Sequence, residues 1–177
     1  MASAGMNGAG FTDASLDQLL ELRRALGHFA TGVTVVTARD GPRPVGLTVN
    51  SFVSVSLDPP LVLWGLRLAS PLYGVFRRCS TFAVNILSSR QVELSRRFAT
   101  PEIDRFEGLS TFEGLDGVPL LPGCVASFEC RREQGHVAGD HAIFIGRVER
   151  FTASERGHPL VLCRGRYIVE AALPNCA

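Results

Sequence analysis

The sequence predicts a mainly β domain in which a closed or nearly closed antiparallel barrel carries peripheral helices. Three observations support this fold class. About six or seven apolar or β-branched runs have the length of strands, only three segments show helical spacing, and strands and helices do not alternate regularly. A doubly wound α/β fold requires regular alternation, so an antiparallel barrel that helices flank or plug is the better prediction.

Length and composition are those of one ordinary globular domain. The chain has 177 residues, of which 46% are hydrophobic, so it is long enough to bury a core. Its 18 basic and 17 acidic side chains give a net charge of +1, which provides no electrostatic case for nucleic acid or an anionic membrane surface as partner. We expect a disordered N-terminal tail at 1–14, a single domain at 15–172 and a C-terminal tail at 173–177.

The cysteines and the N-terminus favour a soluble, cytoplasmic protein. The cysteines are odd in number and form no C-x-x-C pair, which argues against a zinc site and a disulfide framework and favours free thiols. The N-terminal residues lack the basic and apolar regions of a signal peptide, and no apolar run approaches the roughly 18 residues of a membrane span. The cysteines are Cys79, Cys124, Cys130, Cys163 and Cys176.

The first quarter of the domain predicts a helix followed by a strand. Ser15 and Gln18 have the spacing of a capping box, and leucines at helical intervals follow as far as Phe29. The β-branched run from Val33 to Thr37 predicts a strand, and Asp40-Gly41 predicts the turn after it.

The stretch from Val45 to Trp64 places polar side chains beside the core of a sheet. The alternation from Val53 to Leu57 predicts a half-buried strand, and the apolar run from Leu61 to Trp64 predicts a strand buried on both faces. Thr48 to Ser51, just before them, is small and polar. Amides and hydroxyls there could hydrogen-bond a planar heteroaromatic ligand without adding charge. The alternative is a Ser/Thr-rich strand with one solvated face.

Ser70 and Pro71 predict the start of a short helix that runs to about Arg78. Ser70 is a good N-cap and Pro71 suits the first helical position. Free N–H groups, the Ser70 hydroxyl and nearby Arg67 make this helix start a candidate anion site. In the alternative interpretation Ser70 merely caps the helix.

The second half of the chain predicts further strands around one more helix. Asn85 lies inside the first of these strands, where its amide needs partners from the backbone or from a ligand. Ser88 and Gln91 form a second capping-box pattern for a helix that runs to Phe98. The predicted strands are 81–87, 125–131, 141–151 and 167–169, with a loop-rich excursion at 108–123 and a turn at 136–140.

His141 is the titratable residue of most interest. It follows Gly139-Asp140 at the start of a strand, where a side chain can point into the mouth of a barrel, and Asp140 could orient it. A structural histidine is the alternative. The four histidines lack metal-ligand spacing, so no metal site is expected. A dinucleotide fingerprint after a strand, a P-loop and a G-x-S-x-G elbow are all absent, and a Cys-His pair stays open.

Seven segments occur in an order that resembles the short-chain flavin reductases, from about Leu22 to Val169. This family supplies reduced flavin to the monooxygenases of two-component systems. The segments are ATGVTVVTA (Ala30–Ala38), GLTVNSFVSVSLDPPLVL (Gly46–Leu63), FAVNIL (Phe82–Leu87), LSRRFA (Leu94–Ala99), RFEG (Arg105–Gly108), PLLPG (Pro119–Gly123) and GDHAIFIGRV (Gly139–Val148).

The resemblance implies an FMN-binding split β-barrel and a homodimer with flavin near the subunit interface. It implies hydride transfer from NADH or NADPH to FMN or FAD, and a flavin-dependent monooxygenase as the partner that receives the reduced flavin. Two alternatives stay open, since one barrel hosts several functions. One is a flavin enzyme with its own organic substrate, and the other is a non-catalytic flavin- or heme-binding module.

The resemblance also implies the site residues. It assigns nicotinamide positioning to His141. Many relatives read D-R-S-S where this chain has Arg67-Leu68-Ala69-Ser70, which leaves the phosphate contacts, and with them the choice between FMN and FAD, open. Flavin contacts are assigned to Thr31, Thr48, Val49 (where relatives often have Ala), Asn50, Ser51, Arg67, Ser70, Ala83, Asn85 and Phe98.

Overall fold

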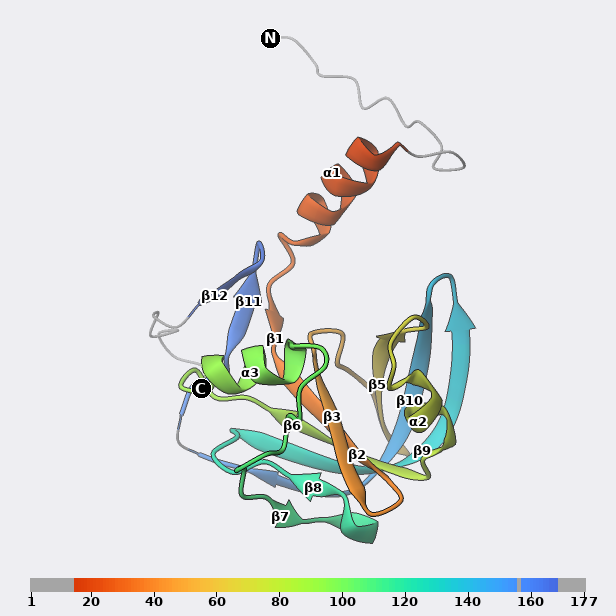
Figure 1. Ribbon diagram of the computed structural model, residues 1–177, viewed down its shortest axis with the longest axis vertical. Helices are drawn as coiled ribbons and strands as arrows, with labels where there is room; N and C mark the ends of the chain where they lie inside the picture. Colours follow the sequence, from red (N-terminus) through yellow and green to blue (C-terminus); the bar gives the residue numbers. More distant parts are fainter. Residues whose placement is uncertain (1–14, 156, 169–177) are drawn as a thin grey trace, which may run out of the picture.

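The computed structural model describes residues 15–155 and 157–168, so both predicted tails lie outside the described residues. Within these ranges the fold is mainly β, with three α-helices (Figure 1). The helices are α1 (Leu16–Leu26), α2 (Tyr73–Arg78) and α3 (Val92–Ala99), and a 3-10 turn spans Leu115–Gly117. The strands are β1 (Thr31–Gly32), β2 (Thr34–Asp40), β3 (Arg43–Val49), β4 (Val53–Leu57), β5 (Pro60–Arg67), β6 (Thr81–Ile86), β7 (Phe112–Glu113), β8 (Pro119–Leu120), β9 (Ala126–Ala138), β10 (His141–Ala153), β11 (Val161–Cys163) and β12 (Arg166–Ile168).

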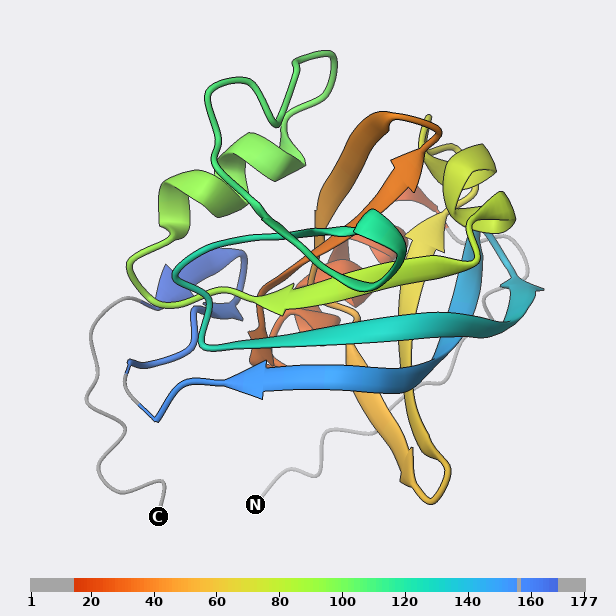
Figure 2. The same ribbon diagram turned by 90° about the horizontal axis from the view of Figure 1, so that it is seen from below.

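Seven strands form one antiparallel sheet in the order β3-β2-β6-β9-β10-β5-β4. The long β9–β10 ladder has two register shifts, between Ile145 and Gly146 and between Val148 and Arg150. Such irregularities bend a strand and increase its twist. The sheet curls round in both views (Figure 1, Figure 2), but β3 and β4 remain edges among the described strands. This open, curled sheet agrees with the predicted split barrel.

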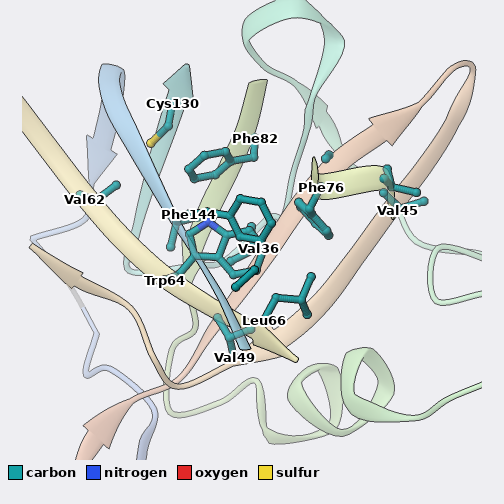
Figure 3. Close-up of a cluster of buried hydrophobic side chains, with 14 residues drawn as sticks. Val36, Val45, Val49, Val62, Trp64, Leu66, Phe76, Phe82, Cys130 and Phe144 are labelled. Atoms are coloured by element: carbon teal, nitrogen blue, oxygen red, sulfur yellow. The ribbon is translucent and has the colours of Figure 1, made fainter. Parts of the chain in front are cut away.

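The interior of the curled sheet is packed with aromatic rings (Figure 3). Trp64 of β5 stacks on Phe144 of β10 and meets Phe76 of α2 edge-on, both at 4.9 Å between ring centroids. Gly146 lies directly against the Phe82 ring and Cys130, so a side chain there would overlap the core. These contacts join β5 and β10 to β6 and α2, and they stabilise the curled shape of the open sheet around one core.

Helix α1 and strand β4 carry apolar side chains that are not buried within the single chain. Helix α1 has the predicted Ser15–Gln18 capping box, yet none of its residues is buried, and it projects from the sheet in Figure 1. On β4, Val53 and Val55 are about half exposed and Leu57 is 92% exposed. The prediction of a half-buried strand at 53–57 is therefore wrong for the single chain, and both surfaces have the character of a contact face.

Two predictions in the 61–78 region need correction. The Leu61–Trp64 run is not buried on both faces: Val62 and Trp64 point into the core, and Leu61 and Leu63 are only partly buried. Ser70 does not cap the helix, because α2 begins at Tyr73, and the Ser70 hydroxyl instead accepts a hydrogen bond from the Leu72 N–H at 3.3 Å. A six-residue helix that starts three positions later removes the helix-start argument for an anion site.

Further differences concern the start of α3, which is Val92 and not about Ser89 as predicted, and several short or exposed strands. Strand β9 continues through His136 to Ala138, so the predicted turn at 136–140 shrinks to Gly139-Asp140. Strand β11 was not predicted, and the loop at 108–123 contains the short β7–β8 pair. These segments are polar or very short, so they lack the hydrophobic alternation from which strands are recognised.

Three thiols, of which Cys130 is buried and Cys79 and Cys124 are partly buried, are expected to react slowly in the folded protein. Burial raises the pKa of Cys79 and Cys124 to about 11 and of Cys130 to about 12. At pH 8 only about one such thiol in a thousand is ionised, against roughly a quarter of ordinary thiols. In a variant with Cys163→Ser and Cys176→Ser, we expect a thiol-specific disulfide reagent to react at least about 100-fold more slowly before unfolding in guanidinium than after it. Rapid reaction of the three remaining thiols in the folded variant would contradict their shielding from solvent.

The same burial makes the fold sensitive to alkaline pH. The unfolded chain ionises its thiols near pH 8.5, whereas the folded chain keeps Cys79, Cys124 and Cys130 protonated until well above that value. The stabilisation from these neutral buried thiols is complete below about pH 8.5 and is lost as the pH rises toward the folded pKa values.

Candidate functional site

A cavity of about 520 Å³ lies where the end of β3, the end of β5 and the C-terminal end of α3 meet. Eight of the residues predicted for the site line it, although they come from four separate parts of the chain. They are Thr48, Val49, Asn50, Ser51, Arg67, Ser70, Phe98 and His141. The other lining residues are Leu47, Gly65, Leu66, Ala69, Pro71, Ala99, Pro101 and Arg105.

Hydroxyl groups fix two walls of this cavity. The Thr48 hydroxyl donates to the backbone carbonyl of Ser95 at 2.7 Å and so ties β3 to α3. The Ser51 hydroxyl accepts from the Gly65 N–H at 2.9 Å and donates to the Gly65 carbonyl at 3.1 Å, which ties the chain after β3 to β5. These side chains therefore hold the shape of the wall, and Asn50 between them is exposed to the cavity.

The β3 wall offers neutral hydrogen-bonding groups. In the described part of the sheet β3 pairs with β2 alone, so its other side presents backbone N–H and C=O groups that have no partner strand. Phe98, which also lines the cavity, is fully buried and packs edge-on against Phe106, with ring centroids 5.1 Å apart. A flat heteroaromatic ring could lie against such a wall and hydrogen-bond along its edge.

The ionisable side chains that line the cavity are all basic residues. They are Arg67, Arg105 and His141, and the lining includes no carboxylate. The sequence predicted neutral hydrogen-bonding groups at Thr48 to Ser51 and a cation at Arg67, and the cavity brings these together with Arg105. Such a cavity favours a ligand that combines an apolar ring system with an anionic group.

Arg105 is the residue that the sequence reasoning missed. Its Nε donates to the Thr100 carbonyl at 3.0 Å and its Nη1 to the Gly46 carbonyl at 2.7 Å, so it bridges the loop after α3 to β3. Burial lowers the pKa of this guanidinium, but a group with so high an ordinary pKa stays protonated at neutral pH. Its place in the RFEG segment was the available signal, although nothing local to that segment indicates a cavity.

His141 stands opposite Arg67 in the β10–β5 ladder, at the edge of the cavity. Its Nδ1 lies 2.7 Å from an oxygen of Asp140. The hydrogen bond from His141, followed by the charge of that ring, lowers the pKa of the exposed Asp140 carboxyl. Asp140 therefore orients the imidazole as predicted, and it leaves Nε2 as the ring nitrogen that can contact a ligand.

Three predicted residues are not brought to this cavity. Ala83 and Asn85 are fully buried in β6. The Asn85 amide donates to the Val35 carbonyl and the Thr37 hydroxyl at 3.1 and 3.2 Å, and its oxygen accepts from the Leu121 N–H and the Ser127 hydroxyl at 3.0 and 3.2 Å. Asn85 thus finds hydrogen-bond partners inside the protein, one of the two alternatives that the sequence left open, and the flavin contact that the resemblance implies for it stays a prediction.

Thr31 is the third of these residues. It lies on β1, opposite Leu162 of β11, away from the cavity wall. Its hydroxyl oxygen is buried and has no hydrogen-bond partner among the residues that the structure describes. A second subunit or a ligand could supply that partner, but within one chain Thr31 is separate from the cluster of eight residues.

Comparison with known proteins decides the family. Residues 26–169 match the family described as the flavin reductase like domain, which covers most of the chain. The chain belongs to this family. The NADH-dependent FMN reductase SmoA of Agrobacterium fabrum is 48% identical over 145 residues, which cover 82% of each protein. The reductase component of the flavin-dependent trigonelline monooxygenase of Acinetobacter baylyi is 46% identical, over 79% of this chain and 46% of that protein.

The fold agrees with that of solved flavin reductases. The NADH:FAD oxidoreductase SgcE6 of Streptomyces globisporus, solved in complex with NAD and FAD fragments, superposes with a TM-score of 0.85 at 36% identity. The match covers 91% of this chain and 98% of that one. The chain spans less than half the length of some curated relatives, the trigonelline reductase component among them.

Among residues 15–155 and 157–168, no group of three or more His, Cys, Asp or Glu side chains is placed to hold a metal ion. In the same ranges, no helix of this flavin reductase is both long and apolar enough to cross a membrane.

Proposed function

We propose that this protein is an NAD(P)H:flavin oxidoreductase that reduces FMN or FAD by hydride transfer and supplies the reduced flavin to a separate monooxygenase. One observation carries the proposal: eight dispersed residues meet in a single cavity with a neutral hydrogen-bonding wall and a cationic region. The relatives named as NADH-dependent FMN reductase and as a monooxygenase reductase component support the same reaction.

The residues present fit a flavin. The cavity volume of about 520 Å³ falls within the range of roughly 300–1,000 Å³ for small-molecule sites. The free backbone edge of β3 and the Asn50 amide would hold the polar edge of the ring, while Ser70, Arg67 and Arg105 would hold the phosphate. A bound flavin supplies the electron-accepting ring for a hydride from NADH or NADPH.

The protein's own part in the reaction is to position two rings and to exclude water. No acid–base pair is required, because the hydride chemistry belongs to the cofactors. Val49 and Leu66 give the cavity an apolar lining, and His141 would contact the nicotinamide through Nε2 while Asp140 holds its Nδ1. Thr48 and Ser51 keep the wall in place through their hydrogen bonds to α3 and β5.

The proposed assembly is a homodimer in the cytoplasm. Apolar side chains on α1 and β4 are exposed in the single chain, among them Leu16, Leu26 and Val53, and a second copy would cover them. Sedimentation at about twice the chain mass of 19.1 kDa is the expected result. Sedimentation as a monomer would contradict the dimer.

The function is tested by the steady-state oxidation of NADH and NADPH by the purified protein, with FMN and FAD each added. We expect turnover that saturates with added flavin, because a flavin reductase of a two-component system binds flavin and releases it. The four pairs together establish both cofactor preferences. Folded protein that turns over none of the four pairs would overturn the proposal, and flavin that is retained and does not exchange would count against the transfer step.

A further inference from the structure

A second cavity of about 500 Å³ continues from the first along the same walls. Strand β3 lines the second cavity with residues 43–46 and the first with residues 47–49. The end of α3 and the loop after it do the same, with Ala99 and Pro101 at the first cavity and residues 102–104 at the second. Because the same segments pass from one cavity to the other, the two are chambers of a single groove.

Two residues stand at the junction of the chambers, because Pro71 and Arg105 line both. Hydrogen bonds to the Gly46 and Thr100 carbonyls hold the Arg105 guanidinium in place there. Within the described residues no carboxylate lies within ion-pair distance of this guanidinium. A half-buried cation that is held by carbonyl groups and lacks an acidic partner is suited to an anionic ligand group.

The charge changes from one chamber to the next. The first chamber is lined by basic side chains without a carboxylate, whereas the second is lined by Asp40, Glu102 and Asp104 together with Arg43. Carboxylates accept hydrogen bonds from hydroxyl and amino groups, and an arginine plane stacks on an aromatic base. The groove therefore has, in order, a neutral wall with basic side chains, a cationic junction at Arg105 and a chamber rich in carboxylates, of which Asp40 lies 3.7 Å from Arg78.

We propose that the second chamber binds the adenosine portion of FAD and that Arg105 binds the pyrophosphate at the junction, so that this protein selects FAD over FMN. The inference rests on the proposed function, because it places the flavin ring in the first chamber. It goes further in naming the flavin, and it gives roles to Arg105 and to the second chamber.

Direct binding tests this inference without turnover. The dissociation constants of riboflavin, FMN and FAD are measured by flavin fluorescence titration of the flavin-free protein. For the unmodified protein we expect FAD to bind about tenfold more tightly than FMN. Equal affinities, or tighter binding of FMN, would overturn the inference.

A substitution that fills the second chamber isolates its contribution. Ile103 lines the second chamber but not the first, and it is 46% exposed. Ile103→Trp therefore adds bulk where the adenosine would lie and does not disturb the core. We expect the FAD affinity to fall about tenfold more than the FMN affinity. Thr111→Trp is the matched control, because Thr111 is exposed and lies outside both chambers, and it should leave the ratio of the two affinities within about twofold.

Arg105→Gln tests the junction. The variant should weaken FMN and FAD at least about tenfold more than riboflavin, which has no phosphate. A purely structural role for Arg105, as the bridge between Gly46 and Thr100, would weaken all three flavins alike and would overturn its assignment. If Ile103→Trp raises the KM for NADH and leaves the FAD-to-FMN ratio unchanged, the second chamber belongs to the nicotinamide dinucleotide and the inference is wrong.

These outcomes separate the inference from the proposed function. Selective loss of FAD binding in a protein that does not oxidise NADH would support the FAD groove and overturn the reductase function. Equal turnover with FMN and FAD, with no selective effect of Ile103→Trp, would support the reductase function and overturn the FAD groove. Failure to bind riboflavin, FMN and FAD would overturn both.

Discussion

Replacing Asn85 by leucine is expected to lower the free energy of unfolding by about 3–5 kcal/mol, the sum of two or more buried polar groups left without partners. The substitution leaves the Leu121 N–H and the Ser127 hydroxyl without an acceptor inside the protein. It also removes the amide that joins β6 to the Val35 carbonyl of β2. For a chain of this size the midpoint of thermal unfolding should fall by roughly 10 °C. Guanidinium and thermal unfolding followed by circular dichroism would measure both quantities.

Asn50→Leu is the matched control, because it makes the same change at an asparagine that is exposed at the cavity. Its unfolding free energy should change by less than about 1 kcal/mol, while its flavin affinity should fall. The two variants thus separate an asparagine that stabilises the fold from one that is proposed to contact the ligand. A stable Asn85→Leu protein with weakened flavin binding would instead support the flavin contact that the resemblance implies for Asn85.

His141→Ala should raise the KM for the nicotinamide cofactor by about tenfold, the loss expected for one well-placed hydrogen bond to a ligand. The flavin dissociation constant should change by less than about twofold, since the neutral wall that is proposed to hold the flavin ring belongs to β3. Steady-state kinetics at saturating flavin and fluorescence titration of flavin measure the two effects separately. Equal losses in both would mean that His141 supports the cavity as a whole.

Asp140→Asn provides the control for orientation. The Asp140 carboxyl, like any exposed aspartate, is ionised at neutral pH, and the hydrogen bond from His141 lowers its pKa further, so its charge is lost only in more acidic solution. The amide in the variant can still accept from His141 but carries no charge. We therefore expect a KM increase of about two- to threefold, smaller than that of His141→Ala. An unchanged KM in the Asp140→Asn variant would contradict the orienting role of Asp140.

The sequence by itself determined the strand-rich fold class, the first helix and the segments that carry the site. These features rest on local signals. The β-branched run at Val33, the capping box at Ser15 and the polar cluster from Thr48 to Ser51 are readable from neighbouring residues. Ordered motifs spread along the chain then identified the family without any need to know where the segments meet.

The tertiary structure alone decided which polar residues face the cavity. Asn50 and Asn85 both lie in motifs of this family, but the curl of the sheet exposes the first and surrounds the second with partners from β2, β9 and the chain near Leu121. Arg105 stands 59 residues from the Gly46 carbonyl that it contacts, and the two chambers share it only because distant segments converge. A local pattern carries no information about such contacts, because burial and charge at a site are sums over residues that only folding brings together.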